Sequence, residues 1–179
     1  MAPGELRERF TRVLKGHIAL ASCVFPQGVG GPHLDAMARR ALWDAGLDYD
    51  HGTGHGVGSF LSVHEGPASV SRAGRMVALA AGMIVSDEPG YYEPGAYGIR
   101  LENLLLVQPS EIGVRKAFLR FETLTLAPFD RRLIEVGLLS GEERGWVDAY
   151  HARVWAEIGP GLDGADREWL RETCQRLDV

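Results

Sequence analysis

The sequence is poor in cysteine and contains no long hydrophobic run. Its 179 residues include two cysteines, Cys23 and Cys174, which lie far apart and form no CxxC pair. This low cysteine content predicts a cytoplasmic protein in which both thiols are reduced and buried, and a single disulfide is the alternative. No stretch approaches the roughly 20 apolar residues that span a bilayer, and the charged start MAPGELRERF is unlike a secretion signal. We therefore expect no membrane partner.

Basic charge is also scarce. The chain has 19 Lys and Arg against 24 Asp and Glu, a formal net charge of −5, and no basic run longer than Arg39–Arg40. This balance argues against a nucleic-acid partner. Hydrophobic residues make up 45% of the chain and charged residues 24%, as is usual for a globular protein. The length suits one core, or two tightly apposed subdomains.

Hydrophobic periodicity predicts helices at both ends of the chain and strands in the middle. Apolar residues at three- and four-residue spacing indicate helices over 4–23 and 33–45. The predicted strands are 83–88, 98–107 and 118–126. The tail over 130–177 is predicted to be helical again, with Ser140 as a cap before Glu142 and Glu143. This order indicates the α+β class.

The stretch HGTGHGVGSFLSVHEGP, residues 51–67, combines His51, His55 and His64 with many glycines. Each glycine costs a helix about 1 kcal/mol relative to alanine, so the stretch is predicted to be extended or looped. In a strand, residues four apart lie roughly 13 Å from each other, so at most one of His51 and His55 binds a given ion directly. The glycines indicate that something approaches the backbone closely. The alternative is a flexible surface loop with solvated histidines.

Glu88 and Glu102 each lie in an otherwise apolar strand, where an unpaired carboxylate would cost several kcal/mol. If 83–88 and 98–107 pair as a hairpin, the two carboxylates can converge on one face. Together with His55 they form the ligand set of a catalytic zinc or manganese site with an open water position. The alternative for either glutamate is a salt bridge, for which Arg100 is available.

Three segments resemble the C-terminal part of the Xaa-Pro aminopeptidases: HGTGHGVGSFLSVHEGP, SDEPGYYEPGAYGIRLEN and EWLRETCQRL. These enzymes belong to the M24 pita-bread metallopeptidases. The resemblance implies an incomplete pita-bread fold, in which a curved antiparallel sheet with flanking helices is followed by a C-terminal helical segment. The implied domains are residues 1–127, from the catalytic domain, and 128–179, a C-terminal extension. Prolidases and creatinases share the fold but fit less well, although a preference for dipeptides stays open.

The resemblance also implies roles for individual residues. His55 and Glu88 would bind one ion, and Glu102 would bridge two. His64 would steady the substrate carbonyl and shuttle protons, and His51 would line the pocket for proline. The remaining two positions, Arg100 and Tyr92, would orient carboxylates or substrate. The implied metal is manganese, with zinc or cobalt as alternatives, and its bound water would attack the peptide carbon.

The family's dinuclear site also takes two aspartates from a strand pair that precedes the first helix, and no such segment occurs in this sequence. We therefore expect at most one divalent ion, bound weakly. The incomplete sheet is expected to leave an exposed edge, to be covered in a homodimer or by a chain carrying the missing half. The competing hypotheses are a fragment of an active Xaa-Pro aminopeptidase, a non-catalytic module that binds peptides or proteins, and a truncated reading frame.

Overall fold

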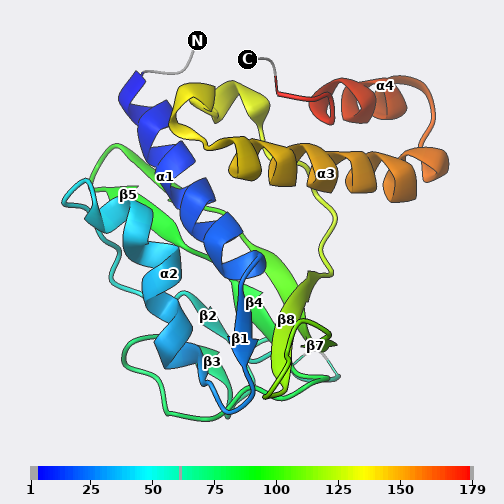
Figure 1. Cartoon of the computed structure of the whole chain (residues 1–179). Helices are drawn as coiled ribbons and strands as arrows, with labels where there is room; N and C mark the ends of the chain where they lie inside the picture. The colour runs from blue at the N-terminus through cyan, green and yellow to red at the C-terminus, as the bar shows by residue number, and fades with distance from the viewer. Residues whose placement is uncertain (1–3, 61, 178–179) are drawn as a thin grey trace. The chain divides into compact units, whose positions relative to one another are not determined.

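A computed structural model describes residues 4–60 and 62–177 (Figure 1). The chain divides into two compact units. One unit is Arg12–Thr125, and the other joins the N-terminal residues up to Thr11 to the chain from Leu126 onward. The first helix, α1 (Gly4–Ala21), contributes residues to both units.

The larger unit contains a four-stranded antiparallel sheet with the strand order β1-β8-β7-β4. The strands are β1 (Val24–Pro26), β4 (Ile84–Asp87), β7 (Asn103–Ser110) and β8 (Phe118–Thr123). The predicted strand over 118–126 is thus confirmed over its first six residues. In the described part of the chain, β1 pairs with β8 alone, so it forms one edge of this sheet.

The core of the larger unit lies between the sheet and the helices. Buried side chains alternate with more exposed ones along most of β7 and the first part of β8, and the buried ones include Leu105 and Val107 of β7 and Phe121 of β8. Helix α1 contacts the sheet through His17, which lies 3.3 Å from Asp87 of β4. It packs closely on α2 (Gly31–Trp43), because a Cβ at Gly16 would lie 1.9 Å from the Ala38 carbonyl oxygen. Both predicted N-terminal helices are confirmed: the first ends two residues earlier than predicted, and the second is shifted by two residues towards the N-terminus.

A long hairpin continues from β4 into β5 (Gly90–Glu93) and returns through β6 (Tyr97–Arg100) into β7. The paired residues keep one register throughout, since Asp87 faces Asn103 and Gly90 faces Arg100. The predicted pairing of 83–88 with 98–107 is therefore confirmed. The second strand is broken where Leu101 and Glu102 separate β6 from β7.

The smaller unit is helical. Three short 3-10 turns, Arg131–Leu133, Val136–Leu138 and Gly159–Gly161, accompany α3 (Gly141–Ile158) and α4 (Gly164–Thr173). The predicted cap is confirmed, because Ser140 Oγ accepts from the Glu143 amide at 3.1 Å and the Ser140 amide donates to Glu143 Oε2 at 2.7 Å. The tail is therefore helical mainly from residue 141 onward.

Two expectations need correction. The sequence patterns gave no strand between the first two helices, yet Val24–Pro26 pairs with β8 because Phe25 packs on Phe121 at 5.2 Å between ring centroids. Both cysteines are free, as expected, but Cys23 is buried and Cys174 is half-buried. Among the described residues, no helix is long and apolar enough to cross a membrane.

Candidate metal centre

The histidine segment runs along the outer edge of β4. Strand β2 (Gly54–His55) pairs with strand β3 (Ser69–Val70). Beyond β2, the Val57 amide donates a hydrogen bond to the Ile84 carbonyl of β4 at 2.9 Å. The predicted extended or looped conformation is confirmed. A Cβ at Gly54 would lie 1.9 Å from the Ser86 carbonyl oxygen, and one at Gly56 would lie 2.1 Å from that of Glu65. Glycine is required here because backbone packs directly on backbone, as the sequence indicated.

His55 and Glu88 lie in direct contact, with Nε2 3.1 Å from Oε1. The other ring nitrogen, Nδ1, lies 3.0 Å from the Gly56 carbonyl oxygen, which can only accept, so Nδ1 carries the proton. In the neutral ring, the bare Nε2 then faces a carboxylate oxygen, and two lone pairs meet unless a cation or a proton lies between them. Two ligands of one ion, each about 2.1 Å from it, lie about 3.0–3.4 Å apart, so this spacing fits adjacent ligands.

Ser86 links the two candidate ligands. Its hydroxyl accepts from the His55 amide at 2.9 Å and donates to Glu88 Oε1 at 3.0 Å. Arg100 Nη1 lies 3.7 Å from Glu88 Oε2, so the ion pair considered as an alternative is also present. Glu88 is thus fixed on both oxygens, one facing His55 and the other facing Arg100.

Glu102 is exposed and lies outside the His55–Glu88 contact. The register that joins Asp87 to Asn103 places Glu102 directly opposite Glu88 on the hairpin. Opposite residues of an antiparallel pair project from the same face, with Cβ atoms about 4.5–5.5 Å apart. No three His, Cys, Asp or Glu side chains within residues 4–60 and 62–177 gather closely enough to hold a metal ion. Two of the three candidate ligands are therefore in contact, and the third is across the hairpin.

His64 lies beside His55. It is exposed on the loop that follows β2, and the two ring centroids are 4.1 Å apart at an interplanar angle of 46°. The loop turns back at this point because the Glu65 amide donates to the Gly56 carbonyl at 2.9 Å. An imidazole with free access to solvent therefore stands next to the candidate metal ligand.

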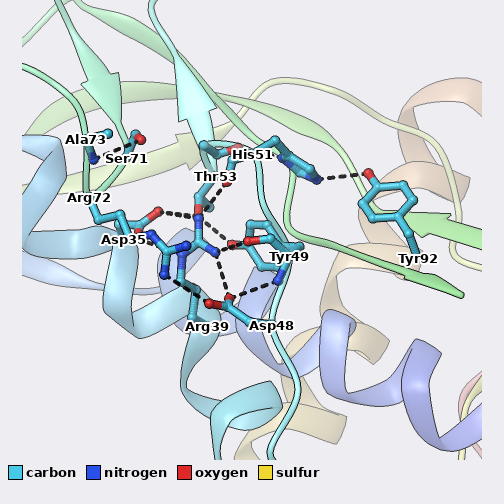
Figure 2. A network of polar contacts seen from close by, with 11 residues as sticks. Asp35, Arg39, Asp48, Tyr49, His51, Thr53, Ser71, Arg72, Ala73 and Tyr92 are labelled. Carbon is cyan, nitrogen blue, oxygen red and sulfur yellow. Dashed lines mark hydrogen bonds and ion pairs between the residues drawn. The ribbon is translucent and has the colours of Figure 1, made fainter. Parts of the chain in front are cut away.

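His51, Tyr92 and Arg100 form a directed chain of hydrogen bonds. Arg100 Nε donates to the Tyr92 hydroxyl at 2.8 Å. Figure 2 shows the next contact, in which this hydroxyl lies 2.9 Å from His51 Nε2. His51 Nδ1 is 2.8 Å from the Gly52 carbonyl oxygen and so carries the ring proton. The Tyr92 hydroxyl therefore donates to Nε2. Three of the four residues implied to contact substrate or orient the site are thus brought together, and the fourth, His64, lies beside His55.

A buried polar cluster behind the glutamates has no counterpart in the sequence predictions. His17 of α1 lies 3.3 Å from Asp87 through Nδ1 and 3.0 Å from the Asn103 side chain through Nε2. Burial lowers the pKa of His17 to about 4, while burial and the charge of Glu88 raise the pKa of Asp87 well above its usual value. The sequence did contain a signal for this cluster. Asp87 and Asn103 are the chain neighbours of Glu88 and Glu102, and successive side chains of a strand point to opposite faces, so these two residues were predictable on the inner face.

Comparisons with known proteins identify the family of this chain. Residues 1–109 match the model of metallopeptidase family M24, and residues 117–177 match that of the C-terminal region of peptidase M24. The chain is 50% identical over 181 residues to a probable Xaa-Pro aminopeptidase P of Laccaria bicolor, covering 97% of the chain and 28% of that protein. It is 53% identical to aminopeptidase P2 of Arabidopsis thaliana, covering 96% of the chain and 25% of that protein. The chain thus spans between a quarter and a third of the length of these relatives.

Solved structures show the same relationship. The X-prolyl aminopeptidase of Caenorhabditis elegans, described as a cytosolic enzyme with a di-nuclear active site, superimposes with a TM-score of 0.92 at 41% identity. This match covers 98% of the chain and 29% of that enzyme. The prolidase of Pyrococcus furiosus matches with a TM-score of 0.56 at 28% identity, over 70% of the chain and 34% of that enzyme. The predicted α+β fragment of the pita-bread fold is therefore confirmed, and the chain belongs to metallopeptidase family M24.

Proposed function

We propose that this chain is the C-terminal part of the catalytic site of an Xaa-Pro aminopeptidase, which removes the first residue from peptides with proline second. The observation that carries this proposal is the 3.1 Å contact between His55 Nε2 and a Glu88 carboxylate oxygen, in a ring whose Nδ1 faces the Gly56 carbonyl. Such a pair is stable when a cation lies against both atoms. The sequence similarity to proteins named Xaa-Pro aminopeptidase P supports the choice of substrate.

His55 and Glu88 would hold the metal ion, and Glu102, opposite Glu88 on the hairpin, would complete this side of the site. When bound, a divalent ion would supply an activated water for attack on the peptide carbon. The carboxylate-rich set favours manganese, with zinc and cobalt as alternatives. With these residues alone, the chain binds at most one ion, and binds it weakly.

The neighbouring residues would handle the peptide. His64, exposed beside His55, would donate a hydrogen bond to the substrate carbonyl and carry protons. His51 and Tyr92 would form the wall of the pocket for proline, because their rings meet edge to face at 5.4 Å. Arg100 would orient this wall and Glu88 together, since it contacts both Tyr92 and Glu88.

Three further features belong to this proposal. Residues 1–127 would be the catalytic portion and 128–179 the C-terminal extension. The protein would be cytoplasmic, like the Caenorhabditis elegans enzyme. Its edge strand β1 would be covered in a homodimer or by a chain that carries the remaining ligands.

A second candidate is a non-catalytic module that binds peptides or proteins. It is favoured by the finding that no three potential ligands gather into a metal-holding group among the described residues. The two candidates differ in what they require of Glu88. A catalytic metal site requires the negative charge of the Glu88 side chain. A peptide-binding module requires only a side chain of the same size, which glutamine also provides.

Peptide hydrolysis distinguishes the two. The chain is combined with a polypeptide that supplies the two aspartate ligands, and release of alanine from Ala-Pro-Ala is measured with Mn²⁺. We expect hydrolysis of this peptide but not of the matched peptide Ala-Ala-Ala, and loss of activity with a chelator or with Glu88→Gln. Calorimetric titration of the chain alone should give one weak Mn²⁺ site. Two tight sites per chain, or hydrolysis that survives both the chelator and Glu88→Gln, would contradict the proposal.

A further inference from the structure

Arg39 is a buried cation in the middle of α2, with 1% of the residue exposed. A charge in this position is stable only when opposite charges and hydrogen-bond acceptors surround it. The adjacent Arg40 is exposed and pairs with Asp44 on the surface of the same helix. The two neighbouring arginines therefore provide a matched comparison between a buried site and a solvated one.

The guanidinium group of Arg39 uses all five of its N–H donors (Figure 2). The acceptors and distances are Asp35 Oδ2 at 2.7 Å and Oδ1 at 3.3 Å, Asp48 Oδ1 at 2.8 Å, the Tyr49 carbonyl at 2.7 Å and the His51 carbonyl at 2.6 Å. One side chain thus joins α2 to three residues of a single segment, 48–51. A lysine has three donors on one atom and cannot reproduce this planar arrangement.

The segment is held at further points around the guanidinium. The ring of Tyr49 lies under Arg39, with the guanidinium carbon 3.8 Å from the ring centroid. The Tyr49 hydroxyl is hydrogen-bonded to Thr53, whose own hydroxyl donates to Asp35 Oδ1 at 2.7 Å. Four residues of this segment are therefore each bonded to α2: Asp48, Tyr49, His51 and Thr53.

This attachment determines where the His51 ring stands. Arg39 holds the His51 carbonyl, and the His51 ring extends from this fixed point to the Tyr92 hydroxyl on the hairpin (Figure 2). His55, four residues later, is held differently, through its amide to Ser86 Oγ and through its pairing with Ser69. Loss of the Arg39 contacts would therefore displace His51 and leave His55 in place.

We propose that Arg39 is a positioning residue for the peptide-binding side of the site: it fixes the His51 backbone so that the imidazole stays against Tyr92. The proposal builds on the proposed function, because it assigns His51 and Tyr92 to the wall that receives the peptide. It separates this wall from the metal ligands, which β4 and Ser86 support. Two sides of one site thus have independent supports.

The test compares Arg39→Lys with Arg40→Lys in the 179-residue chain. NMR cross-peaks between the His51 and Tyr92 rings, which are 5.4 Å apart between centroids, are expected to weaken strongly in Arg39→Lys. Those between His55 and His64 should persist, and Arg40→Lys should leave both sets unchanged. A folded Arg39→Lys chain with unaltered His51–Tyr92 cross-peaks would overturn the proposal.

A second measurement separates positioning from general destabilisation. Binding of Ala-Pro-Ala, followed by shifts of the Tyr92 ring resonances, should weaken about tenfold in Arg39→Lys while the affinity for Mn²⁺ stays the same. Equal loss of both affinities would indicate a purely structural role and contradict the proposal. If the unmodified chain binds neither probe, the proposed function fails, whereas the ring cross-peaks still decide the role of Arg39.

A milder pair of variants covers the case in which Arg39→Lys does not fold. Asp48→Ala removes one acceptor of the guanidinium from a side chain that is 33% exposed, and Asp44→Ala removes the partner of Arg40 from the same region. We expect weaker His51–Tyr92 cross-peaks in Asp48→Ala and no change in Asp44→Ala. Identical spectra for the two variants would count against the proposal.

Discussion

The amide of Glu88 donates a 2.7 Å hydrogen bond to the carbonyl oxygen of Thr53. This bond joins the acidic hairpin to the histidine segment two residues before His55. The separation of His55 and Glu88 is therefore set by main-chain pairing in addition to the side-chain contact. A pair held in this way loses little conformational freedom when an ion binds, which favours binding.

Removing the Ser86 hydroxyl should weaken metal binding. Ser86→Ala deletes the group that accepts from the His55 amide and donates to Glu88, so both candidate ligands lose their orientation. We expect the Mn²⁺ affinity, measured by calorimetry, to fall about 10- to 100-fold. Ser22→Ala, which removes a hydroxyl bonded to the Ile18 carbonyl at the end of α1, serves as the control and should not change it. Equal affinities for the two variants would show that Ser86 does not support the ligands.

A side chain at Gly54 should destabilise the larger unit. In Gly54→Ala the new Cβ would lie 1.9 Å from the Ser86 carbonyl oxygen, so the segment must move away from β4. Overpacking of this kind costs about 1–3 kcal/mol of unfolding free energy, measurable by urea denaturation. Gly145→Ala is the matched control, because no atom lies within 4 Å of its Cβ in the interior of α3. That substitution should raise stability by up to about 1 kcal/mol.

The sequence predicted those features that depend on neighbouring residues. Ser140 and Glu143 form the expected cap, because the capping box is a contact between residues three apart. The hairpin was also predictable, since apolar runs and the turn-rich PGYYEPGAYG indicate two strands and their connection. The opposition of Glu88 and Glu102 then follows from register.

The features that the sequence did not reveal depend on partners far along the chain. β1 has three residues and becomes a strand only through pairing with β8, almost a hundred positions later. The contact of His17 with Asp87 and Asn103 likewise joins α1 to a distant hairpin. Arg39 had a local signal in the Asp35–Arg39 spacing, but its bonds to Tyr49 and His51 depend on how the chain turns after α2. Local periodicity carries no information on such pairings.

Loss of the cap at α3 should lower the stability of the smaller unit. Ser140→Ala removes the hydroxyl that accepts from the Glu143 amide, which costs about 1 kcal/mol of unfolding free energy. Asp163 occupies the same position before α4 but makes no capping hydrogen bond through its side chain. Asp163→Ala should therefore cost less. Urea denaturation followed by tryptophan fluorescence measures both, and a larger effect for Asp163→Ala would contradict the assignment.

Acid should destabilise the smaller unit through His151. This side chain is buried, and its Nε2 accepts a 3.0 Å hydrogen bond from the Phe129 amide, so the ring is neutral in the folded state. Burial, reinforced by the charge of Arg131, lowers the pKa of His151 from 6.5 to about 4. Between pH 6.5 and 4, the His151 side chain therefore binds a proton in the unfolded chain but not in the folded chain. As a result, the free energy of unfolding has its full value above pH 6.5 and decreases as the pH falls towards 4.

His151→Gln tests this origin, because its side-chain oxygen can accept from the Phe129 amide without titrating. Unfolding free energies are compared between pH 7 and 4.5 by tryptophan fluorescence, to which Trp146, Trp155 and Trp169 of the smaller unit contribute. We expect the unmodified chain to lose at most about 3 kcal/mol more than His151→Gln over this range. Exposed His33, replaced by Gln, should leave the slope unchanged. An undiminished slope in His151→Gln would assign the acid sensitivity to other groups.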